Sequence, residues 1–364
     1  NSIIPYPVRS YLFLGNKKCC IYAACGVSQT PKTNKICEEE DIMKKWKVMM
    51  ALPLALMVSP LTVMAGDTKD VSMAFCTWTG YSPMFIAQQE GYFKDAGLNV
   101  DIQVIEDAST YAALITKGSI QFLATAQDSN IKMYANGAKS DFVLTMDASE
   151  GADGLVATED IKSLDDLAGK KVALDKSASS YYFFLTALEN ESSLTEDDIN
   201  VIDMGDTTEA GLAFMSGSVD AAIMWEPELS EALESVNGAH ALVTSADYPD
   251  TILDSLVVNS DYAKENPDVV EAVEDAWYKA VDFLNENPDQ AYEEMASGFE
   301  EVTAEDVASD VKGLKFFGKE DNEKLNDESN DDSIYVISQK MADFWKEKGE
   351  CETDDLTDFF ELVK

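Results

Sequence analysis

Aromatic, hydroxyl and carboxylate side chains gather in five short segments of this sequence. The segments are CTWTGYSP (76–83), QDSN (127–130), DASEGADG (147–154), KSASSYY (176–182) and WEPE (225–228), and each follows an apolar run typical of a strand. With the run before QDSN, they supply Trp78, Thr79, Tyr81, Thr125, Gln127, Asp128, Asp147, Ser179, Ser180, Tyr181, Trp225 and Glu226. Aromatic faces combined with carboxylates suit a cation or a flat nitrogen heterocycle. The residue types therefore indicate a binding site for a small molecule.

Each of these side chains also has a structural role open to it. Ser179, Ser180 and Asp128 can cap the helices that follow them. Glu226 can simply open the helix that starts near Pro227. Taken singly, each residue fits its structural role better than a binding role. The binding hypothesis depends on their joint placement at strand ends, where binding residues concentrate.

Catalytic chemistry has little support in the sequence. His240 is the only histidine, so a Ser/His/Asp triad would depend wholly on it. The glycines are scattered singly and form no nucleotide-binding loop, and the cysteines show no paired ligand spacing. Asp147 and Glu226 are conceivable as a general acid and base, without further support. We expect no catalytic residue, no metal site and no cofactor.

The first 66 residues are expected to lie outside the fold. Residues 43–66 combine a basic start, an apolar stretch shorter than the ~20 residues of a membrane-spanning helix, and small residues before Gly66, which is the layout of a signal peptide. Residues 1–42 lack sustained periodicity and hold four of the six cysteines, and we interpret them as a non-native upstream extension. We therefore expect an exported, periplasmic protein. Cys76 and Cys351 could form a disulfide, or Cys76 could be a buried thiol.

The charge of the chain excludes another class of function. Asp and Glu number 68 against 27 Lys and Arg, which gives a formal net charge of −41. Nucleic-acid binding needs a basic surface, so we do not expect it. A heavily solvated acidic surface is expected instead. Arg9 is the only arginine, so the part expected to fold has no arginine fork for an anion.

Strands and helices must alternate to place the five segments at strand ends. Apolar and period-two runs predict strands at 71–75, 98–105, 121–126, 141–146, 170–174, 200–204 and 219–225. Helical patterns lie between them at 84–93, 111–118, 131–137, 179–190 and 207–218. From Tyr262 onward we expect mainly helices, with one apolar stripe over 269–284 and a solvated loop over 319–333. The alternation predicts an α/β fold with open, mainly parallel sheets, which bind ligands at the carboxyl ends of their strands.

Four segments of the chain resemble the solute-binding proteins of nitrate-, sulfonate- and taurine-type ABC importers. They are TGYSPMFIAQQEGYFKDAGLNVDI, ALITKGSIQFLATA, IKSLDDLAGKKVAL and AFMSGSVDAAIMWEP, in this order and with matching spacing. The resemblance covers nearly all of residues 70–350. It implies a two-lobed type 2 periplasmic-binding-protein fold, each lobe an open, mainly parallel sheet flanked by helices. A related branch that makes the thiamine pyrimidine carries a Cys-rich motif that this sequence lacks, so the resemblance implies a non-enzyme.

The resemblance also implies domain boundaries, a site and partners. Lobe one would comprise residues 70–156 and 255–364, and lobe two residues 157–254. Family members line their cleft at positions that match Trp78, Thr79, Gly80, Tyr81, Thr125, Gln127, Asp128, Ser179, Ser180 and the turn from Trp225 to Pro227, and Asp147 matches a loop that faces the cleft. The expected partners are a small-molecule solute and the permease and ATPase subunits of an ABC importer. The receptor itself is expected to be a monomer.

The class of solute stays open at this stage. The family takes sulfonates, taurine or nitrate, and the helix start at Ser179 and Ser180 is a candidate anion site. Carboxylates such as Asp147 beside aromatic faces instead favour an amine, a guanidine-like or a pyrimidine-like solute. We expect a receptor for such a nitrogenous solute, and Asp147 is the carboxylate expected to matter most. A sulfonate-type receptor and a thiamine-pyrimidine enzyme of the same fold are the alternatives.

Overall fold

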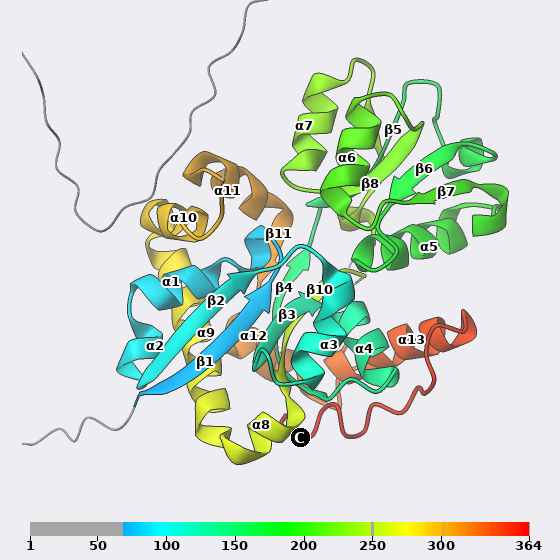
Figure 1. Ribbon diagram of the computed structural model, residues 1–364. Coiled ribbons are helices and arrows are strands. Elements are labelled where there is room, and N and C mark those ends of the chain that lie inside the picture. Colours follow the sequence, from blue (N-terminus) through cyan, green and yellow to red (C-terminus); the bar gives the residue numbers. More distant parts are fainter. Residues whose placement is uncertain (1–67, 249–250, 301, 364) are drawn as a thin grey trace, which may run out of the picture. The chain divides into compact units, whose positions relative to one another are not determined.

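The computed structural model describes residues 68–248, 251–300 and 302–363. The predicted upstream extension (1–42) and signal peptide (43–66) lie outside the described residues. Two β-sheets with helices on their faces form the described part, so the α/β fold predicted from the strand–helix alternation is confirmed (Figure 1). Within these ranges, no helix is both long and apolar enough to cross a membrane.

The larger sheet, called sheet A below, has six strands in the order β11-β4-β10-β3-β1-β2. Its strands are β1 (Lys69–Phe75), β2 (Leu98–Val104), β3 (Phe122–Ala126), β4 (Ser140–Ser149), β10 (Leu253–Asn259) and β11 (Leu314–Phe316). β1 pairs in parallel with β2 and β3, whereas β10 runs antiparallel between β3 and β4. Parallel pairing follows from a helix that returns the chain to the starting edge. The carboxyl ends of β1 and β3 therefore lie at the same edge of sheet A.

The helices that accompany sheet A come from both ends of the described chain. They are α1 (Pro83–Gln89), α2 (Tyr92–Asp95), α3 (Tyr111–Thr116), α4 (Gln127–Ala135), α8 (Ser260–Glu265), α9 (Pro267–Glu286), α10 (Pro288–Ala296), α11 (Ala304–Asp310), α12 (Lys319–Leu325) and α13 (Ile334–Glu347). The apolar stripe predicted over 269–284 forms one face of α9 and is buried where α9 packs against α1 and α10. Burial of such a stripe is what holds a helix of this kind on a sheet.

The smaller sheet, called sheet B, has five strands in the order β7-β6-β8-β5-β9. Its strands are β5 (Asp153–Ala157), β6 (Lys171–Leu174), β7 (Asn200–Asp203), β8 (Ala221–Trp225) and β9 (His240–Thr244). The helices α5 (Ser179–Glu191), α6 (Thr207–Met215) and α7 (Glu228–Ser235) connect them. β6 pairs in parallel with β7 and β8, while β5 runs antiparallel to β8 and β9. Both sheets are therefore mixed, and in neither do parallel pairs outnumber antiparallel ones, as the predicted mainly parallel sheets would require.

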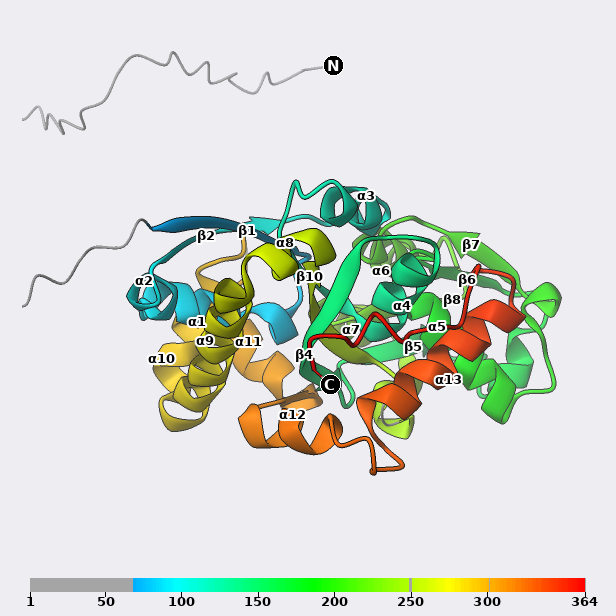
Figure 2. The same ribbon diagram turned by 90° about the horizontal axis from the view of Figure 1, so that it is seen from below.

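The chain passes from one sheet to the other at two places. It leaves sheet A at the end of β4 and enters sheet B where β5 begins at Asp153. It returns after β9 and enters sheet A where β10 begins at Leu253. A third connection is made by α13, which packs on α4 while its Trp345 ring lies 5.8 Å from the rings of Tyr181 and Tyr182 on α5 (Figure 2).

Several predicted element boundaries differ from the structure. The helix expected over 84–93 is split into α1 and α2, because Gly91 adopts a left-handed φ of 80° between them. The helix expected from 131 already begins at Gln127, and the strand expected to end at 146 continues to Ser149. Asp147 is therefore part of a strand, where a loop was predicted. The loop expected over 319–333 contains the helix α12.

The two cysteines of the described part are both free. Of the two possibilities for Cys76, the disulfide with Cys351 is therefore not formed. Burial and the charge of Glu106 raise the pKa of the Cys76 thiol well above its ordinary value. A thiol with a raised pKa is unreactive at neutral pH.

Candidate functional site

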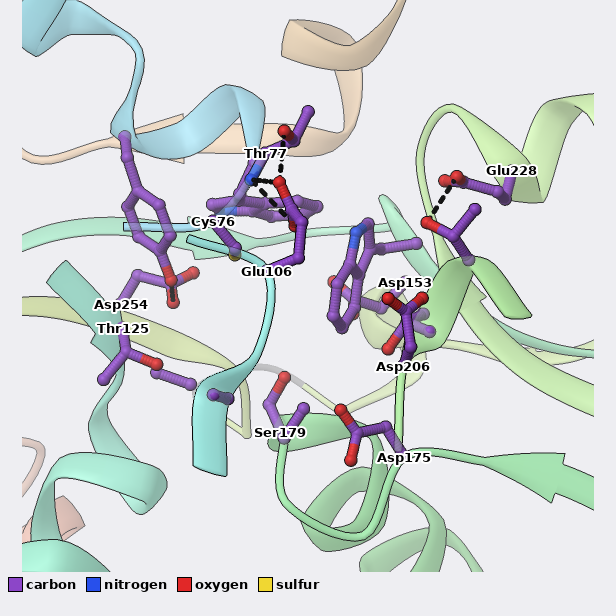
Figure 3. A pocket seen from close by; sticks show the side chains of 18 of the residues that line it. Cys76, Thr77, Glu106, Thr125, Asp153, Asp175, Ser179, Asp206, Glu228 and Asp254 are labelled. Carbon is purple, nitrogen blue, oxygen red and sulfur yellow. Dashed lines mark hydrogen bonds between the residues drawn. The ribbon is translucent and has the colours of Figure 1, made fainter. Parts of the chain in front are cut away.

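A cavity of about 450 Å³ lies where strand ends of sheet A and sheet B meet (Figure 3). It is lined by Cys76, Thr77, Trp78, Tyr81, Glu106, Ala108, Tyr111, Thr125, Ala126, Asp153, Asp175, Ala178, Ser179, Asp206, Thr207, Thr208, Trp225, Pro227, Glu228, Glu231, Ile252, Asp254, Glu300 and Val302. The volume is in the range of small-molecule sites. Because the lining comes from both sheets, a molecule in the cavity would touch both.

Five of the predicted site residues line this cavity. They are Trp78, Tyr81, Thr125, Ser179 and Trp225. Each sits at or just after a strand end or at a helix start, which is where an α/β sheet places its binding groups. The strand-end rule thus brings together residues that are far apart in the sequence.

Trp78 and Trp225 face each other across the two sheets. Their ring centroids are 6.3 Å apart with an interplanar angle of 73°, an edge-to-face arrangement. Trp78 follows β1 of sheet A, and Trp225 is the last residue of β8 in sheet B. Aromatic pairs of this geometry attract each other through their quadrupoles. The two neighbouring rings give the cavity an apolar wall to which both sheets contribute.

A buried network of hydrogen bonds holds the sheet A side of the cavity. Trp78 Nε1 donates to Asp147 Oδ1 over 3.1 Å. The Tyr81 hydroxyl donates to Asp254 Oδ1. Asp147 in β4 and Asp254 in β10 are register partners, so the two carboxyl groups lie side by side. All four side chains are buried.

The two adjacent carboxyl groups of this network resist ionisation together. Burial, and then the charge of Asp254, raises the pKa of Asp147 well above its ordinary value. Burial also raises the pKa of Asp254 to about 6, although hydrogen bonds from Tyr81 and Asp147 oppose the rise. Two carboxylates in contact cannot both be charged cheaply, so the pair retains a proton. Asp147 itself is not part of the cavity lining and reaches the site through Trp78 and Asp254.

Gly80 has a packing role beside this network. A Cβ atom placed on Gly80 would overlap both carboxylate oxygens of Asp147 and Nε1 of Trp78. Glycine is used where another group must approach the backbone this closely. Gly80 thus lets the Trp78–Asp147 hydrogen bond form, and it does not line the cavity.

Asp153 brings a further carboxyl group into the cavity from sheet B. It is the first residue of β5, its register partner is Trp225, and its side chain is 1% exposed. Burial, with the charges of Asp254 and Glu226, raises the pKa of Asp153 to about 7, although a hydrogen bond from Ser149 opposes the rise. No partner satisfies its Oδ2 atom.

The remaining acidic groups of the lining come from several elements. Figure 3 shows the labelled carboxyl groups of Glu106, Asp175, Asp206 and Glu228 around the cavity. Glu106 Oε1 accepts from the Thr77 hydroxyl at 2.7 Å, and Glu228 Oε1 accepts from the Thr208 hydroxyl at 2.9 Å. Asp175 and Asp206 accept backbone N–H bonds within their own turns. Within the described residues, the lining contains no Lys, Arg or His.

Four predicted site residues near the sheet A side are buried but do not line the cavity. They are Thr79, Gly80, Gln127 and Asp128. The Thr79 hydroxyl donates to Asp310 Oδ2 at 2.7 Å. Gln127 Nε2 donates to Ser338 Oγ at 2.8 Å and so ties α4 to α13. Burial raises the pKa of Asp128 to about 6, and Lys132 opposes the rise. None of these three lines the cavity, and neither does Gly80.

The remaining predicted residues also lie outside the lining. Ser180 is fully buried in the first turn of α5. The Tyr181 hydroxyl donates to Glu196 Oε2 at 2.6 Å. Glu226 accepts from the backbone N–H of Ser230 at 3.0 Å and from its hydroxyl at 2.8 Å, which caps α7. For Glu226 the geometry matches the structural alternative.

Asp153 and Asp254 are among the cavity residues that reasoning from the sequence missed. Asp153 lies in the segment DASEGADG but was not singled out, and Asp254 lies in the apolar run LDSLVV. A charged residue inside an apolar strand is a usable signal, because a buried carboxyl group needs a reason to be there. Both residues stand at the start of strands that carry the chain between the sheets.

In the part of the chain that the structure describes, the side chains that could bind a metal ion or form a His-dependent catalytic site are not grouped in one place. Across the described residues, no group of three or more His, Cys, Asp and Glu side chains could hold a metal ion. His240 is the first residue of β9, where a loop was expected, and its Nδ1 lies 3.5 Å from the Gly238 carbonyl oxygen. It is not part of the cavity lining.

Comparison with known proteins finds a matching family model and several relatives that are named as binding proteins. A family model described as NMT1/THI5 like matches residues 78–291. A candidate binding protein of Brucella abortus (strain 2308) is 27% identical over 87% of this chain and 99% of its own. The taurine-binding periplasmic protein of Escherichia coli (strain K12) is 22% identical over 64% of this chain and 72% of its own. The periplasmic aliphatic sulphonate binding protein of Escherichia coli shares the fold, with a TM-score of 0.62 at 21% identity over 79% of this chain and 94% of that chain.

Proposed function

The chain belongs to the NMT1/THI5-like family, and on this premise we propose that it is an extracytoplasmic solute-binding receptor of an ABC importer. We propose sheet A and sheet B, each with its helices, as the two lobes, with β5 opening lobe two and β10 reopening lobe one. The solute is a small organic cation, such as an amine, a guanidine-like or a protonated pyrimidine-like compound. The receptor acts as a monomer outside the cytoplasm and delivers the solute to a permease driven by an ATPase.

The acidity of the cavity lining is the observation that carries the choice of solute. Its ionisable side chains, apart from cysteine and tyrosine, are Glu106, Asp153, Asp175, Asp206, Glu228, Glu231, Asp254 and Glu300. In the described lining no basic side chain offsets them. Uncompensated carboxylates in a cavity with reduced access to water are costly. A cation stabilises them, and the faces of Trp78 and Trp225 add a favourable cation–π contribution.

Binding by this receptor needs no covalent step. A solute in the cavity contacts Trp78 of lobe one and Trp225 of lobe two at once, because both rings line the cavity and come from different sheets. Such a solute stabilises the arrangement with the lobes together by its differential affinity for that state. A thiamine-pyrimidine enzyme of this fold is not favoured, since His240 lies outside the cavity lining.

A sulfonate or taurine receptor is the second candidate. Relatives named for taurine and aliphatic sulphonates favour it, and Ser179 in the first turn of α5 lines the cavity, where a helix N-terminus attracts anions. An anion in this cavity would nevertheless meet the carboxyl groups of Asp153 and Asp254 without a basic side chain to balance it.

Thermal unfolding of the exported protein with candidate solutes separates the two classes. The probes are n-butylamine, methylguanidine, 4-aminopyrimidine, taurine, ethanesulfonate and nitrate. A solute that binds only the folded protein, at 100 times its Kd, stabilises it by about 2.7 kcal/mol. We expect this stabilisation from at least one of the three nitrogenous bases. Stabilisation by ethanesulfonate or nitrate, with none from the bases, would refute the cationic solute.

A further inference from the structure

Two side chains of the cavity lining have a buried polar atom that lacks a hydrogen-bond partner. Among the lining residues that the structure describes, these atoms are Asp153 Oδ2 and Thr207 Oγ1. The two side chains are 1% and 3% exposed. Buried polar atoms are nearly always paired in folded proteins, because an unpaired one has lost its water without compensation. Because Asp153 and Thr207 line the cavity, a solute bound there lies beside the two side chains that hold these unpaired atoms.

Both atoms belong to the sheet B side of the cavity. Asp153 starts β5 and lies opposite Trp225 on β8. Thr207 is the first residue of α6, and the preceding Asp206 caps that helix by accepting from the Glu209 N–H. Because the cap uses Asp206, the hydroxyl of Thr207 is not needed to complete the helix terminus. Figure 3 shows Asp153 and Asp206 on the same side of the cavity.

We propose that the cationic group of the solute donates hydrogen bonds to Asp153 Oδ2 and to Thr207 Oγ1, an inference that rests on the proposed receptor function. The solute must then carry at least two N–H donors at or beside its charge, as primary ammonium, guanidinium and amidinium groups do. A quaternary ammonium ion has no N–H group and would leave both oxygen atoms unpaired. Asp153 and Thr207 thus select among cations.

The surroundings of Asp153 support this assignment. Asp254 and Glu226 are the carboxyl groups that act on Asp153 most strongly, and both disfavour its charge. Asp254 already accepts from Tyr81, and Glu226 already accepts from Ser230, so these two are engaged within the protein. Asp153 is the member of this group whose free oxygen atom is directed to no protein donor. A cation beside it restores the ionised form and supplies the missing donor.

Asp141 offers a matched control for the charge and the burial of Asp153. It lies near the far end of β4, outside the cavity lining, and is 4% exposed. Its Oδ2 atom is also buried without a partner, while Oδ1 accepts from the Ser260 hydroxyl at 2.6 Å. Asp141→Asn therefore removes a similar carboxyl group without touching the cavity.

Isothermal titration of the exported protein and its variants tests the proposal. The probes are methylguanidine, n-butylamine and tetramethylammonium, with ethanesulfonate as the anion. We expect the first two to bind and tetramethylammonium to bind at least ~10-fold more weakly, since it lacks donors. Asp153→Asn should weaken binding of methylguanidine by ~10- to 100-fold, and Thr207→Val by several-fold. Asp141→Asn should bind like the unmodified protein.

The outcomes separate this proposal from the proposed function. If tetramethylammonium binds as tightly as methylguanidine, or if Asp153→Asn binds methylguanidine within twofold of the unmodified protein, the Asp153–Thr207 assignment is wrong while the cation receptor stands. If ethanesulfonate binds and none of the three cations does, the receptor for cations is itself refuted. Thermal unfolding of each variant without probe establishes that it is folded before titration.

Discussion

The two sides of the cavity use their polar groups differently. On the sheet A side, Trp78 donates to Asp147 and Tyr81 donates to Asp254 within a buried network. On the sheet B side, Asp153 Oδ2 and Thr207 Oγ1 are buried without a partner. Both sides belong to the lining or touch it, and both are shielded from solvent. Among the side chains that line the cavity, the difference therefore concerns pairing and not burial. Oδ2 of Asp147, which lies behind the lining, is also unpaired.

Pairing separates groups that hold the fold from groups that remain available to a solute. A paired donor or acceptor stabilises the folded chain. Its removal leaves the partner buried without a hydrogen bond, which costs free energy because that partner has also lost its water. An unpaired buried group destabilises the folded chain, so its replacement by an apolar or neutral group of the same shape should stabilise it. Mutations on the two sides should consequently change stability in opposite directions.

The largest effect is expected from Gly80→Ala on the sheet A side. The new methyl group would overlap the Asp147 carboxylate and the Trp78 indole, so the hydrogen bond between them must break or the backbone must move. We expect the free energy of unfolding, measured by urea denaturation, to fall by about 3 kcal/mol. Gly318→Ala is the control, because its methyl group would meet no atom closer than 3.8 Å. Equal effects of the two changes would show that Gly80 has no special packing role.

Trp78→Phe tests the hydrogen bond without adding volume. The change removes the Nε1–H group and leaves Asp147 Oδ1 without its donor. We expect a loss of about 2 kcal/mol in the free energy of unfolding. Trp225→Phe on the sheet B side is the matched control, because among the described contacts the Trp225 ring makes no hydrogen bond. A loss from Trp225→Phe as large as that from Trp78→Phe would contradict the contrast between the sides.

Asp153→Asn on the sheet B side should raise the free energy of unfolding, whereas the changes on the sheet A side lower it. Asp153 has a pKa of about 7 in the folded protein, above its ordinary value of 3.8. A raised folded pKa means that the folded state holds the proton more tightly, so stability is lost as pH rises toward that pKa. Asp153→Asn removes this loss, while the neighbouring Asp147, Asp254 and Glu226 stay unchanged.

Urea denaturation of Asp153→Asn and the unmodified protein between pH 5 and pH 8 measures this effect. At pH 5 the unfolded chain has already ionised Asp153 while the folded protein still holds the proton, so the variant should already be the more stable of the two. Its advantage should grow by about 1.4 kcal/mol for each pH unit up to pH 7 and level off by pH 8, where the folded and unfolded chains are both ionised. A difference that does not change with pH would show that Asp153 does not titrate in this range.

The smallest expected effect comes from a pair of threonines. Thr207→Val replaces an unpaired buried hydroxyl with a methyl group, so we expect a gain of about 1 kcal/mol in the protein without solute. Thr79→Val is the matched change on the sheet A side, where it removes the donor to Asp310 and should cost about 1 kcal/mol or more. The same sign for both changes in thermal unfolding would break the comparison.

Local patterns in the sequence account for much of the fold. The alternation of apolar runs with helical periods predicted most elements, and the stripe over 269–284 became the buried face of α9. Those signals are local, because period and turn residues are set by neighbours in the chain. The errors at 131 and 146 concern element ends, where polar residues such as Gln127 and Asp147 are buried by tertiary contacts. Within 319–333 a whole helix, α12, was missed.

The sequence predicted where the candidate site lies better than it predicted which residues line it. The rule that ligands bind at strand ends led to Trp78, Tyr81 and Trp225, since those residues directly follow or end apolar strands. It also led to Asp147 and Glu226, which lie outside the lining. In the structure Asp147 accepts a hydrogen bond from Trp78, and Glu226 accepts one from Ser230. A loop position predicts nearness to the site but not the direction of a side chain.

The sequence by itself determined the α/β class, the edge at which a site would lie, and the acidic, arginine-poor chemistry available there. Those properties follow from periodicity and composition. Only the tertiary structure decided which carboxyl groups are paired and which are left free. Oδ1 of Asp254 meets the Tyr81 hydroxyl, and Oδ2 of Asp153 meets no donor, because strand register between distant segments brings a donor to one atom and not to the other. The register between distant strands has no signature in a local stretch of sequence. The contrast between the two sides of the cavity depends on that register.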